Sequence, residues 1–149
     1  MRLLLGCGDE RRDGWERVDR SPRAAPDVVH DLDVVPWPFE DDSVEEVEAN
    51  DVLEHLADVV RFMDECWRVL VPGGRLRIKA VSWRSENLWR DPTHRRGFHV
   101  DTFGYFDPSQ SWGQKYGKFY SDRQWRLLLA LDDGDAVRAE MVPIKECVR

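Results

Sequence analysis

The chain has 149 residues and a formal net charge of −7. This length is typical of one domain with a single hydrophobic core, so we expect one domain over residues 1–149. The acidic balance argues against nonspecific binding to nucleic acid phosphates, and no run of about 18 apolar residues is present that could cross a membrane. Three cysteines without CxxC spacing favour reduced thiols and a cytoplasmic location.

The N-terminal segment MRLLLGCG predicts a buried strand that runs directly into Gly6, Cys7 and Gly8. Glycines at the carboxyl end of a strand let the backbone approach a ligand closely, because no Cβ stands in the way. In open α/β sheets, ligands bind in the crevice at these strand ends. The segment therefore predicts one wall of a ligand site.

Two further short strands are expected over Trp15–Val18, which is followed by Asp19, and over Val28–Leu32, which contains Asp31. The carboxylate of Asp19 could hold a ribose diol. Only ten residues separate Gly8 from Asp19, which leaves no room for a helix after the glycine loop. The missing helix also counts against a dinucleotide, since no helix N-terminus is available to hold a pyrophosphate.

The rest of the chain predicts one long helix and four more strands, which makes seven strands in all. A fourth strand ends at Asn50. The helix is expected from an N-cap at Asp58 to Leu70, because apolar residues recur at helical spacing, and a Pro-Gly-Gly turn separates it from a strand over Arg75–Val81. Near the C-terminus, Trp125–Leu131 and Ala136–Val142 flank an Asp/Gly turn and predict a β-hairpin.

Several predicted strands alternate between apolar and charged residues, whereas parallel strands covered on both faces are apolar nearly throughout. The charged positions that would share one face of the sheet are Glu46, Glu48, Arg75, Arg77, Lys79, Arg138 and Glu140. We therefore expect helices mainly on the other face and cross-strand ion pairs on a solvated charged face. The alternative is a polar face buried in an oligomer such as a homodimer.

Five motifs follow one another along the chain: LLLGCG, GWERVD, VPWPFEDDSVEEV, DVLEHL and RVLVPGG. Together they resemble the class I S-adenosylmethionine-dependent methyltransferases, and in particular their small type-11-like branch. The resemblance is strong over residues 1–82 and loose over the remainder. It implies an α/β fold with a seven-stranded, mixed, mostly parallel Rossmann-like sheet and an antiparallel C-terminal hairpin, here with reduced N-terminal helices.

The resemblance also implies that S-adenosylmethionine (SAM) is the cofactor, and it assigns residues to each part of that molecule. Gly6, Cys7 and Gly8 would lie beneath its amino acid end. Asp19 would accept hydrogen bonds from both ribose hydroxyls, with Arg20 beside it. The alternative for Asp19 is a solvated loop carboxylate without a ligand.

Two further pairs of residues are implied in cofactor binding. Asp31, with the backbone of Leu32, would meet the adenine amino group, although Asp33 or a backbone group could serve instead. Asn50 and Asp51 would present oxygens to the ammonium group and the carboxypropyl arm.

Two histidines are candidate general bases, because the pKa of an imidazole lies near neutrality. His55 follows Glu54 in the DVLEHL motif, and its alternative role is structural, at the crossover into the helix. His94 ends an Asp-Pro-Thr-His segment that resembles one in related small methyltransferases. Asp51, Glu54 and His55 also resemble the ligand cluster of metal-dependent relatives, but metal-free relatives have the same pattern and we expect no metal here.

Residues 83–124 interleave aromatic residues with arginines and histidines, and we expect them to form an insertion or lid on the substrate side. Phe103 and Phe106, three residues apart in a short helix near Asp101, are expected to pack into the core. His94, Arg95 and Tyr105 are better suited to a pocket.

The sequence therefore predicts a SAM-dependent methyltransferase that transfers a methyl group in line to an oxygen or nitrogen of a small molecule or saccharide-like acceptor. The expected partner is that acceptor, without nucleic acid or membrane. The alternative from another class is a SAM-binding sensor or accessory subunit without catalysis, which the small size and the missing helix favour. A nicotinamide-dependent enzyme is a weaker alternative.

Overall fold

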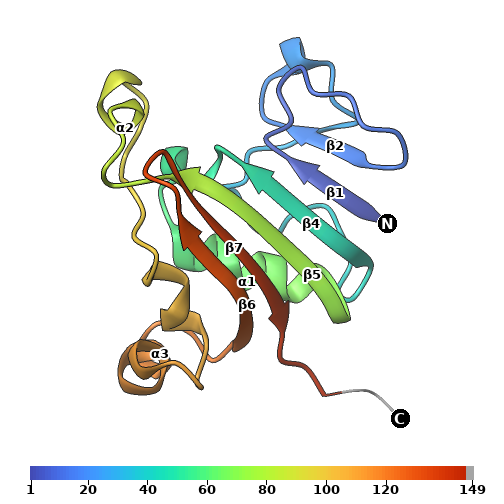
Figure 1. Ribbon diagram of the computed structural model, residues 1–149. Helices are drawn as coiled ribbons and strands as arrows, with labels where there is room; N and C mark the ends of the chain where they lie inside the picture. Colours follow the sequence, from blue (N-terminus) through green and yellow to red (C-terminus); the bar gives the residue numbers. More distant parts are fainter. Residues whose placement is uncertain (147–149) are drawn as a thin grey trace.

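The computed structural model describes residues 1–146, and within them seven strands form one sheet in the order β3-β2-β1-β4-β5-β7-β6 (Figure 1). The neighbours from β3 to β5 pair in parallel, whereas β7 is antiparallel to both β5 and β6. The strand bounds are β1 Arg2–Leu5, β2 Glu16–Asp19, β3 Val28–Val29, β4 Val44–Asn50, β5 Leu70–Val81, β6 Trp125–Asp132 and β7 Ala136–Pro143. The predicted mixed sheet with an antiparallel hairpin is confirmed.

Helical structure is sparse, and its longest element is α1 (Val59–Val69). As predicted, Asp58 is its N-cap and accepts a hydrogen bond from the amide of Arg61 at 2.9 Å. The shorter α-helices are α2 (Asn87–Arg90) and α3 (Ser111–Tyr116), and the 3-10 turns are η1 (Pro22–Ala24), η2 (Leu53–His55), η3 (Thr102–Phe106) and η4 (Gly117–Phe119). None of the helices within residues 1–146 has the length and apolar character needed to span a membrane.

The core lies between the sheet and α1, which is behind the strands in the view of Figure 1. The predicted apolar stripe of α1 is buried at Phe62, Met63 and Cys66. It packs on the apolar face of the strands, which includes Leu3, Leu5, Val47, Ala49, Leu76, Ile78, Ala80, Ala139 and Met141. Each large apolar side chain removed from water stabilises the fold by roughly 1.5–3 kcal/mol, so this one-sided layer supplies most of the hydrophobic driving force.

The opposite face of the sheet is charged and has no helix over it within the described residues, as predicted. Side chains of the seven charged residues are between 18% and 45% exposed. Two ion pairs cross between strands at 2.8 Å, Arg77 with Glu46 and Arg75 with Glu140. The other three residues pair with residues outside the set: Glu48 with Arg12, Lys79 with Asp51, and Arg138 with Asp133.

Two strand boundaries differ from the prediction. The third strand is short because Asp31 turns the chain after it, accepting the amide of Asp33 at 2.9 Å. The fifth strand begins at Leu70, directly after α1, and not at Arg75. Its Pro-Gly-Gly segment causes an irregularity in the pairing with β4 and does not separate two elements.

No helix lies between β1 and β2. The two strands are joined by a loop of residues 6–15, which packs on the charged face of the sheet. Trp15 is stacked between two guanidinium groups, with Arg2 at 5.3 Å and Arg12 at 4.9 Å from the ring centroid. Arg12 also binds Glu48 of β4 at 2.7 Å, so the loop is tied to the charged face. Beneath it, Leu4 is 1% exposed although it lies opposite the main core.

Buried Arg17 of β2 connects this loop to the next one. Its guanidinium donates hydrogen bonds to four backbone carbonyls at 2.7–3.2 Å, two in the first loop (Gly8 and Glu10) and two at the end of η1 (Ala24 and Ala25). One side chain therefore holds both of the connections that follow the first two strands.

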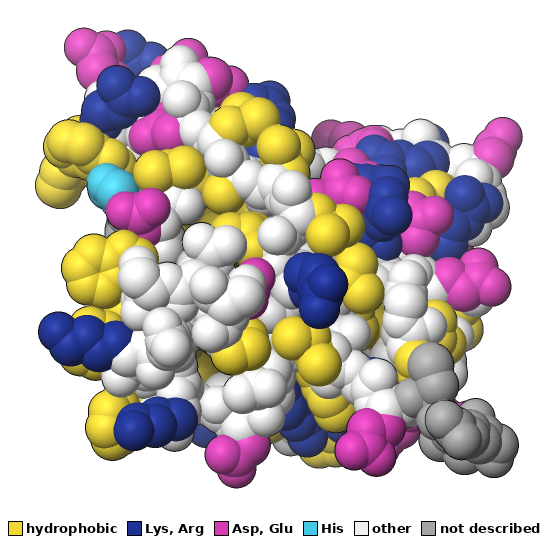
Figure 2. Space-filling view, turned by 60° about the horizontal axis from the view of Figure 1, so that its bottom comes forward, with side chains coloured by type: hydrophobic (Ala, Val, Ile, Leu, Met, Phe, Trp, Pro, Cys, Tyr) yellow, Lys and Arg dark blue, Asp and Glu magenta, His cyan; other side chains and the backbone are white. Residues whose placement is uncertain are grey.

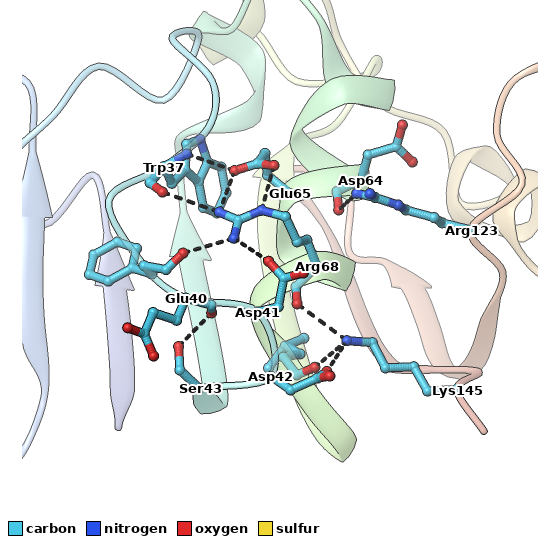
Figure 3. A network of polar contacts seen from close by, with 12 residues as sticks. Trp37, Glu40, Asp41, Asp42, Ser43, Asp64, Glu65, Arg68, Arg123 and Lys145 are labelled. Carbon is cyan, nitrogen blue, oxygen red and sulfur yellow. Dashed lines mark hydrogen bonds and ion pairs between the residues drawn. The ribbon is translucent and has the colours of Figure 1, made fainter. Parts of the chain in front are cut away.

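A second polar network links α1 to the loop that precedes β4 (Figure 3). Arg68 of α1 donates to Glu65 at 2.9 Å and to Asp41 at 2.8 Å, and Glu65 accepts the amide of Trp37 at 2.7 Å. Burial alone would raise the pKa of Glu65, but the hydrogen bonds from Arg68 and Trp37 outweigh it and hold the pKa below its ordinary value. The network anchors the loop before β4 to α1.

Cys7 and Cys66 are buried free thiols, and Cys147 lies outside the described residues. Burial raises the pKa of both described thiols, so they are protonated at neutral pH and are poor nucleophiles.

Candidate functional site

A cavity of about 270 Å³ lies at the carboxyl ends of β1, β2 and β4. Its lining residues are Gly6, Asp19, Arg20, His30, Asp31, Leu32, Asp33, Asp51, Val52, His55, Leu56 and Thr93. The fold thus brings seven of the eleven residues that the sequence suggested for cofactor binding or catalysis into the lining of one cavity: Gly6, Asp19, Arg20, Asp31, Leu32, Asp51 and His55. The other four, Cys7, Gly8, Asn50 and His94, lie outside the lining.

The floor of the cavity requires glycine at position 6. Gly6 has a φ of +59°, and a Cβ built there would lie 2.4 Å from Cγ2 of Val52. Gly8 also has a positive φ, of +50°, but a side chain there would meet open space. The first glycine is needed for close packing and backbone conformation, the second for conformation alone.

Asp19 joins the two loops that border the cavity. Its Oδ2 accepts the amide of Gly8 at 2.9 Å, and its Oδ1 accepts the amide of Ser21 at 2.8 Å. A carboxylate oxygen can accept more than one hydrogen bond, so both oxygens keep acceptor capacity for a ligand in the cavity. Asp19 is therefore a fixed acceptor and not a freely solvated loop residue.

Three consecutive residues after β3, Asp31, Leu32 and Asp33, form another wall of the cavity, and each makes different hydrogen bonds. Asp33 accepts the amide of Ala57 with both carboxylate oxygens, at 3.0 and 3.2 Å, and so ties this wall to the start of α1. The carbonyl of Leu32 accepts the indole N–H of Trp37 at 3.0 Å. Asp31 accepts the amide of Asp33 with Oδ1 alone, so among the described residues its Oδ2 has no hydrogen-bond partner, whereas both oxygens of Asp33 accept one.

At the end of β4, Asp51 and Asn50 point in different directions. Asp51 lines the cavity in a left-handed conformation, with a φ of +56°. Such strain in a residue other than glycine is typical of functional sites. Its carboxylate is 3.3 Å from Nζ of Lys79. The amide of Asn50 instead donates to Glu48 at 2.9 Å on the charged face, so the side chain of Asn50 does not reach the cavity.

The first part of the insertion packs directly on η2 and brings its own residues to the site. The amide of Arg95 donates to the carbonyl of Glu54 at 2.7 Å. The guanidinium of Arg96 donates to the carbonyls of Leu53 at 2.8 Å and Ala57 at 3.3 Å. Arg95, which the sequence suggested for a pocket, thus contacts the site through its backbone.

Thr93 of the insertion reaches His55 across the cavity wall. Its hydroxyl is 2.9 Å from Nδ1 of His55 and donates to Oδ1 of Asp91 at 2.6 Å. The pKa of His55 is lowered, first by burial and then by the neighbouring His94, so its imidazole is neutral at neutral pH. Sequence reasoning did not assign a site role to Thr93, although the Asp-Pro-Thr-His segment was the signal that pointed to it.

His94 lies behind His55 and does not line the cavity. Its side chain is 9% exposed, and its ring meets that of His55 edge-on with centroids 4.8 Å apart. Its Nδ1 is 3.1 Å from the carbonyl of Leu88 and its Nε2 is 3.5 Å from Asp91. His94 therefore supports His55 from behind and has no direct route to a molecule in the cavity.

Glu54, His55 and His94 form the one group within residues 1–146 that could hold a metal ion. Their potential ligand atoms lie within 4.8 Å of one another, whereas ligands bound at about 2.0–2.2 Å to a tetrahedral metal are roughly 3.5 Å apart. Glu54 is 1% exposed, its Oε2 has no partner, and burial raises its pKa. The group would have to contract around a metal, and Asp51, which the sequence suggested as a ligand, is not part of it.

The second part of the insertion lies away from the cavity. Tyr105, which was expected in a pocket, lines a separate small cavity of about 20 Å³ and stacks on Trp112 at 5.5 Å and on Tyr116 at 6.1 Å. Phe103 is fully buried against Phe98, as predicted for a packing residue. In Figure 1, α3 lies beside β6 and far from α2, and Figure 2 shows exposed hydrophobic side chains interleaved with Lys and Arg along one side of the molecule.

Comparison with known proteins agrees with this geometry. Residues 14–78 match a family described as a methyltransferase domain, while no curated protein matches the chain in sequence. Similar solved structures include a chain of the complex between the Haloferax volcanii Trm112 methyltransferase activator and a methyltransferase, and SAM-dependent methyltransferases from Aquifex aeolicus and Archaeoglobus fulgidus.

These three structures are 17%, 12% and 14% identical to the chain, with TM-scores of 0.66, 0.60 and 0.62. The matched regions cover 99%, 94% and 95% of this chain and 83%, 80% and 85% of the other chains. The family match and the shared fold confirm the resemblance seen in the sequence. Residues 14–78 are similar to the methyltransferase domain family, and the chain has the fold of the SAM-dependent methyltransferases.

Proposed function

We propose that this protein binds SAM in the cavity at the ends of β1, β2 and β4 and transfers its methyl group to an oxygen or nitrogen of a small polar acceptor, such as a saccharide. The observation that carries the proposal is the single cavity lined by Gly6, Asp19 and Asp51. These residues were assigned to SAM from the sequence, and they come from three different strands.

The chemistry of the cavity suits this cofactor. The absence of a Cβ at Gly6 leaves room for close backbone approach. In this proposal Asp19 accepts hydrogen bonds from the ribose hydroxyls, Asp31 from the adenine amino group and Asp51 from the ammonium group, and all three residues line the cavity. No α-helix lies between β1 and β2, so the glycine loop has no helix N-terminus to hold a pyrophosphate, which disfavours a nicotinamide dinucleotide.

When bound, SAM supplies a methyl group on a positively charged sulfur that is already a good leaving group. The protein then has two tasks, to align the acceptor with that methyl group and to remove a proton if the acceptor is a hydroxyl. We assign the second task to His55, whose neutral imidazole lines the cavity. His94, the other candidate base, would act only by supporting His55.

The test is calorimetric binding of SAM and of NAD, followed by turnover of SAM to S-adenosylhomocysteine with a panel of small hydroxyl and amine acceptors. We expect SAM binding, no NAD binding and turnover with at least one acceptor. Chelation by EDTA should change the rate little, because burial raises the pKa of Glu54 and Asp51, the oxygen ligand that the sequence suggested, is not part of the group. Loss of activity that Mg²⁺ restores would contradict that expectation.

An accessory or sensor function is the second candidate, and the small cavity and missing helices favour it. It predicts SAM binding without turnover for any acceptor in the panel. Addition of a partner enzyme would then be needed for activity.

A further inference from the structure

Thr93 connects His55 to Asp91 through one hydroxyl group. The hydroxyl oxygen is 2.9 Å from Nδ1 of His55 and 2.6 Å from Oδ1 of Asp91. The amide of Thr93 donates to the same Oδ1 at 2.8 Å, so a tight turn fixes the position of the hydroxyl. These hydrogen bonds hold the pKa of Asp91 below its ordinary value, and the carboxylate is ionised at neutral pH.

The direction of the two hydrogen bonds follows from the number of protons. A threonine hydroxyl has one proton to donate, and an ionised carboxylate can only accept. If Thr93 donated to His55, its oxygen and that of Asp91 would face each other at 2.6 Å with no proton between them. The hydroxyl must therefore donate to Asp91 and accept from Nδ1–H of His55.

We propose that Thr93 is a positioning residue which, together with Asp91, holds His55 in the Nδ1–H tautomer, so that Nε2 accepts the proton of the methyl acceptor. The inference rests on the proposed function for its chemical consequence, but the tautomer itself does not depend on it. The tautomer is set by the hydrogen bond that the other ring nitrogen makes.

The surroundings of His55 leave Nε2 free for this purpose. The charged and titratable groups near the ring are Arg20 after β2, Asp51 and the buried Glu54 after β4, and Asp91 and His94 from the insertion. Within the described residues, no hydrogen bond to Nε2 is formed, whereas Nδ1 is occupied by Thr93. The nitrogen without a partner is thus the one that would be unprotonated.

For a hydroxyl acceptor the atoms balance as follows. The bond between the acceptor oxygen and the methyl carbon forms as the carbon–sulfur bond breaks, and the electron pair of that bond leaves with the sulfur. The hydroxyl proton passes to Nε2, which makes the imidazole of His55 a cation hydrogen-bonded at Nδ1 to Thr93. The adjacent carboxylate of Asp91 stabilises this cation.

The tautomer can be measured directly by long-range ¹H–¹⁵N NMR correlation of the four histidines at neutral pH, with His55→Gln to identify the signals of His55. The wild-type protein should show the Nδ1–H pattern for this ring. Thr93→Val removes the hydroxyl at nearly constant volume and should shift His55 toward Nε2–H, whereas Thr93→Ser should retain the wild-type pattern. Thr102→Val, in the same insertion but away from the cavity, is the matched control.

The kinetic arm uses an acceptor found in the turnover panel. Thr93→Val should lower kcat by about 10- to 100-fold, the range expected for misplacing a general base, while Thr93→Ser stays within about threefold of wild type. The dissociation constant for SAM should change little in both variants.

An Nε2–H pattern in the wild-type protein would overturn the proposal whether or not Thr93→Val folds. An unchanged tautomer and kcat in folded Thr93→Val, equal to those of Thr102→Val, would also overturn it. Failure of SAM to bind the wild-type protein would instead count against the proposed function. The NMR measurement of the His55 tautomer would still test the inference in that case.

Discussion

Asp19 has two functions that a substitution can separate. It braces two loops through backbone amides and offers acceptors to a ligand in the cavity. We predict that Asp19→Ala weakens SAM binding at least tenfold in calorimetry, because each charge-assisted hydrogen bond contributes roughly 1.5–3 kcal/mol and a tenfold change is about 1.4 kcal/mol. Asp133→Ala is the control, since Asp133 also accepts two backbone amides but lies in the β6–β7 turn. Equal affinity in the two variants would remove Asp19 from the binding site.

The lowered pKa of His55 gives a pH prediction with a definite sign. A general base works in its neutral form, and a pKa below the ordinary value near 6.5 keeps His55 neutral at pH 7. The methyl transfer rate should therefore be constant above neutrality and fall as the pH drops below about 6.5. The profile of kcat between about pH 5 and 8 tests this, with His99→Gln as a control for an exposed histidine outside the cavity. A kcat that stays constant down to about pH 5 would show that no imidazole acts as the general base.

At the scale of elements, the buried guanidinium of Arg17 holds together the two connections that follow β1 and β2. We predict that Arg17→Met lowers the free energy of unfolding by about 2–4 kcal/mol, because four backbone carbonyls lose a charged donor in a buried setting. Arg75→Met removes an exposed arginine of the charged face and should cost less than about 1 kcal/mol. Urea unfolding of both variants measures the difference. Similar losses would mean that Arg17 is not the link between the two loops.

Local patterns in the sequence were enough to predict most elements, but not their tertiary links. The helical spacing before Leu70 and the alternation in the strands correctly gave α1, the hairpin and the charged face. The end of β3 was missed because an aspartate side chain turns the chain there. The contact between Thr93 and His55 joins residues 38 apart, and no spacing rule relates such positions. Nor does the sequence show which cavity an aromatic residue of the insertion reaches, and Tyr105 lines a small cavity away from the one that contains His55.

At the scale of the whole molecule, one core runs under the sheet from β1 to β7, but the connections between the strands differ in kind from one half of the sheet to the other. The half formed by β4, β5, β6 and β7 is covered by α1, whereas β1, β2 and β3 are joined by loops that hydrogen bonds hold in place. The residues assigned to SAM come largely from the second half. The catalytic candidates of η2 and the insertion lie at the boundary between them.

Local stability should therefore differ across the sheet, since β1 and β2 are strands of four residues whose connecting loops are held by side-chain hydrogen bonds and not by packed α-helices. We predict that amide hydrogens of β1 and β2 exchange with deuterium faster than those of β5 and β7. SAM at 100 times its dissociation constant should slow exchange in the first group, by up to about 2.7 kcal/mol of added local stability, and leave the second nearly unchanged. Mass spectrometry of peptides after exchange measures both groups, and uniform protection without ligand would contradict the prediction.

The missing helices thus have a consequence for the protein in a cell, where degradation begins from partly opened states. An opened β1–β3 segment would expose Leu3, Leu4 and Leu5 to proteases, and a bound ligand closes that route by mass action. The lifetime of the protein would then depend on how much ligand is present. The supply of the methyl donor would set the amount of this protein as well as the rate at which it works.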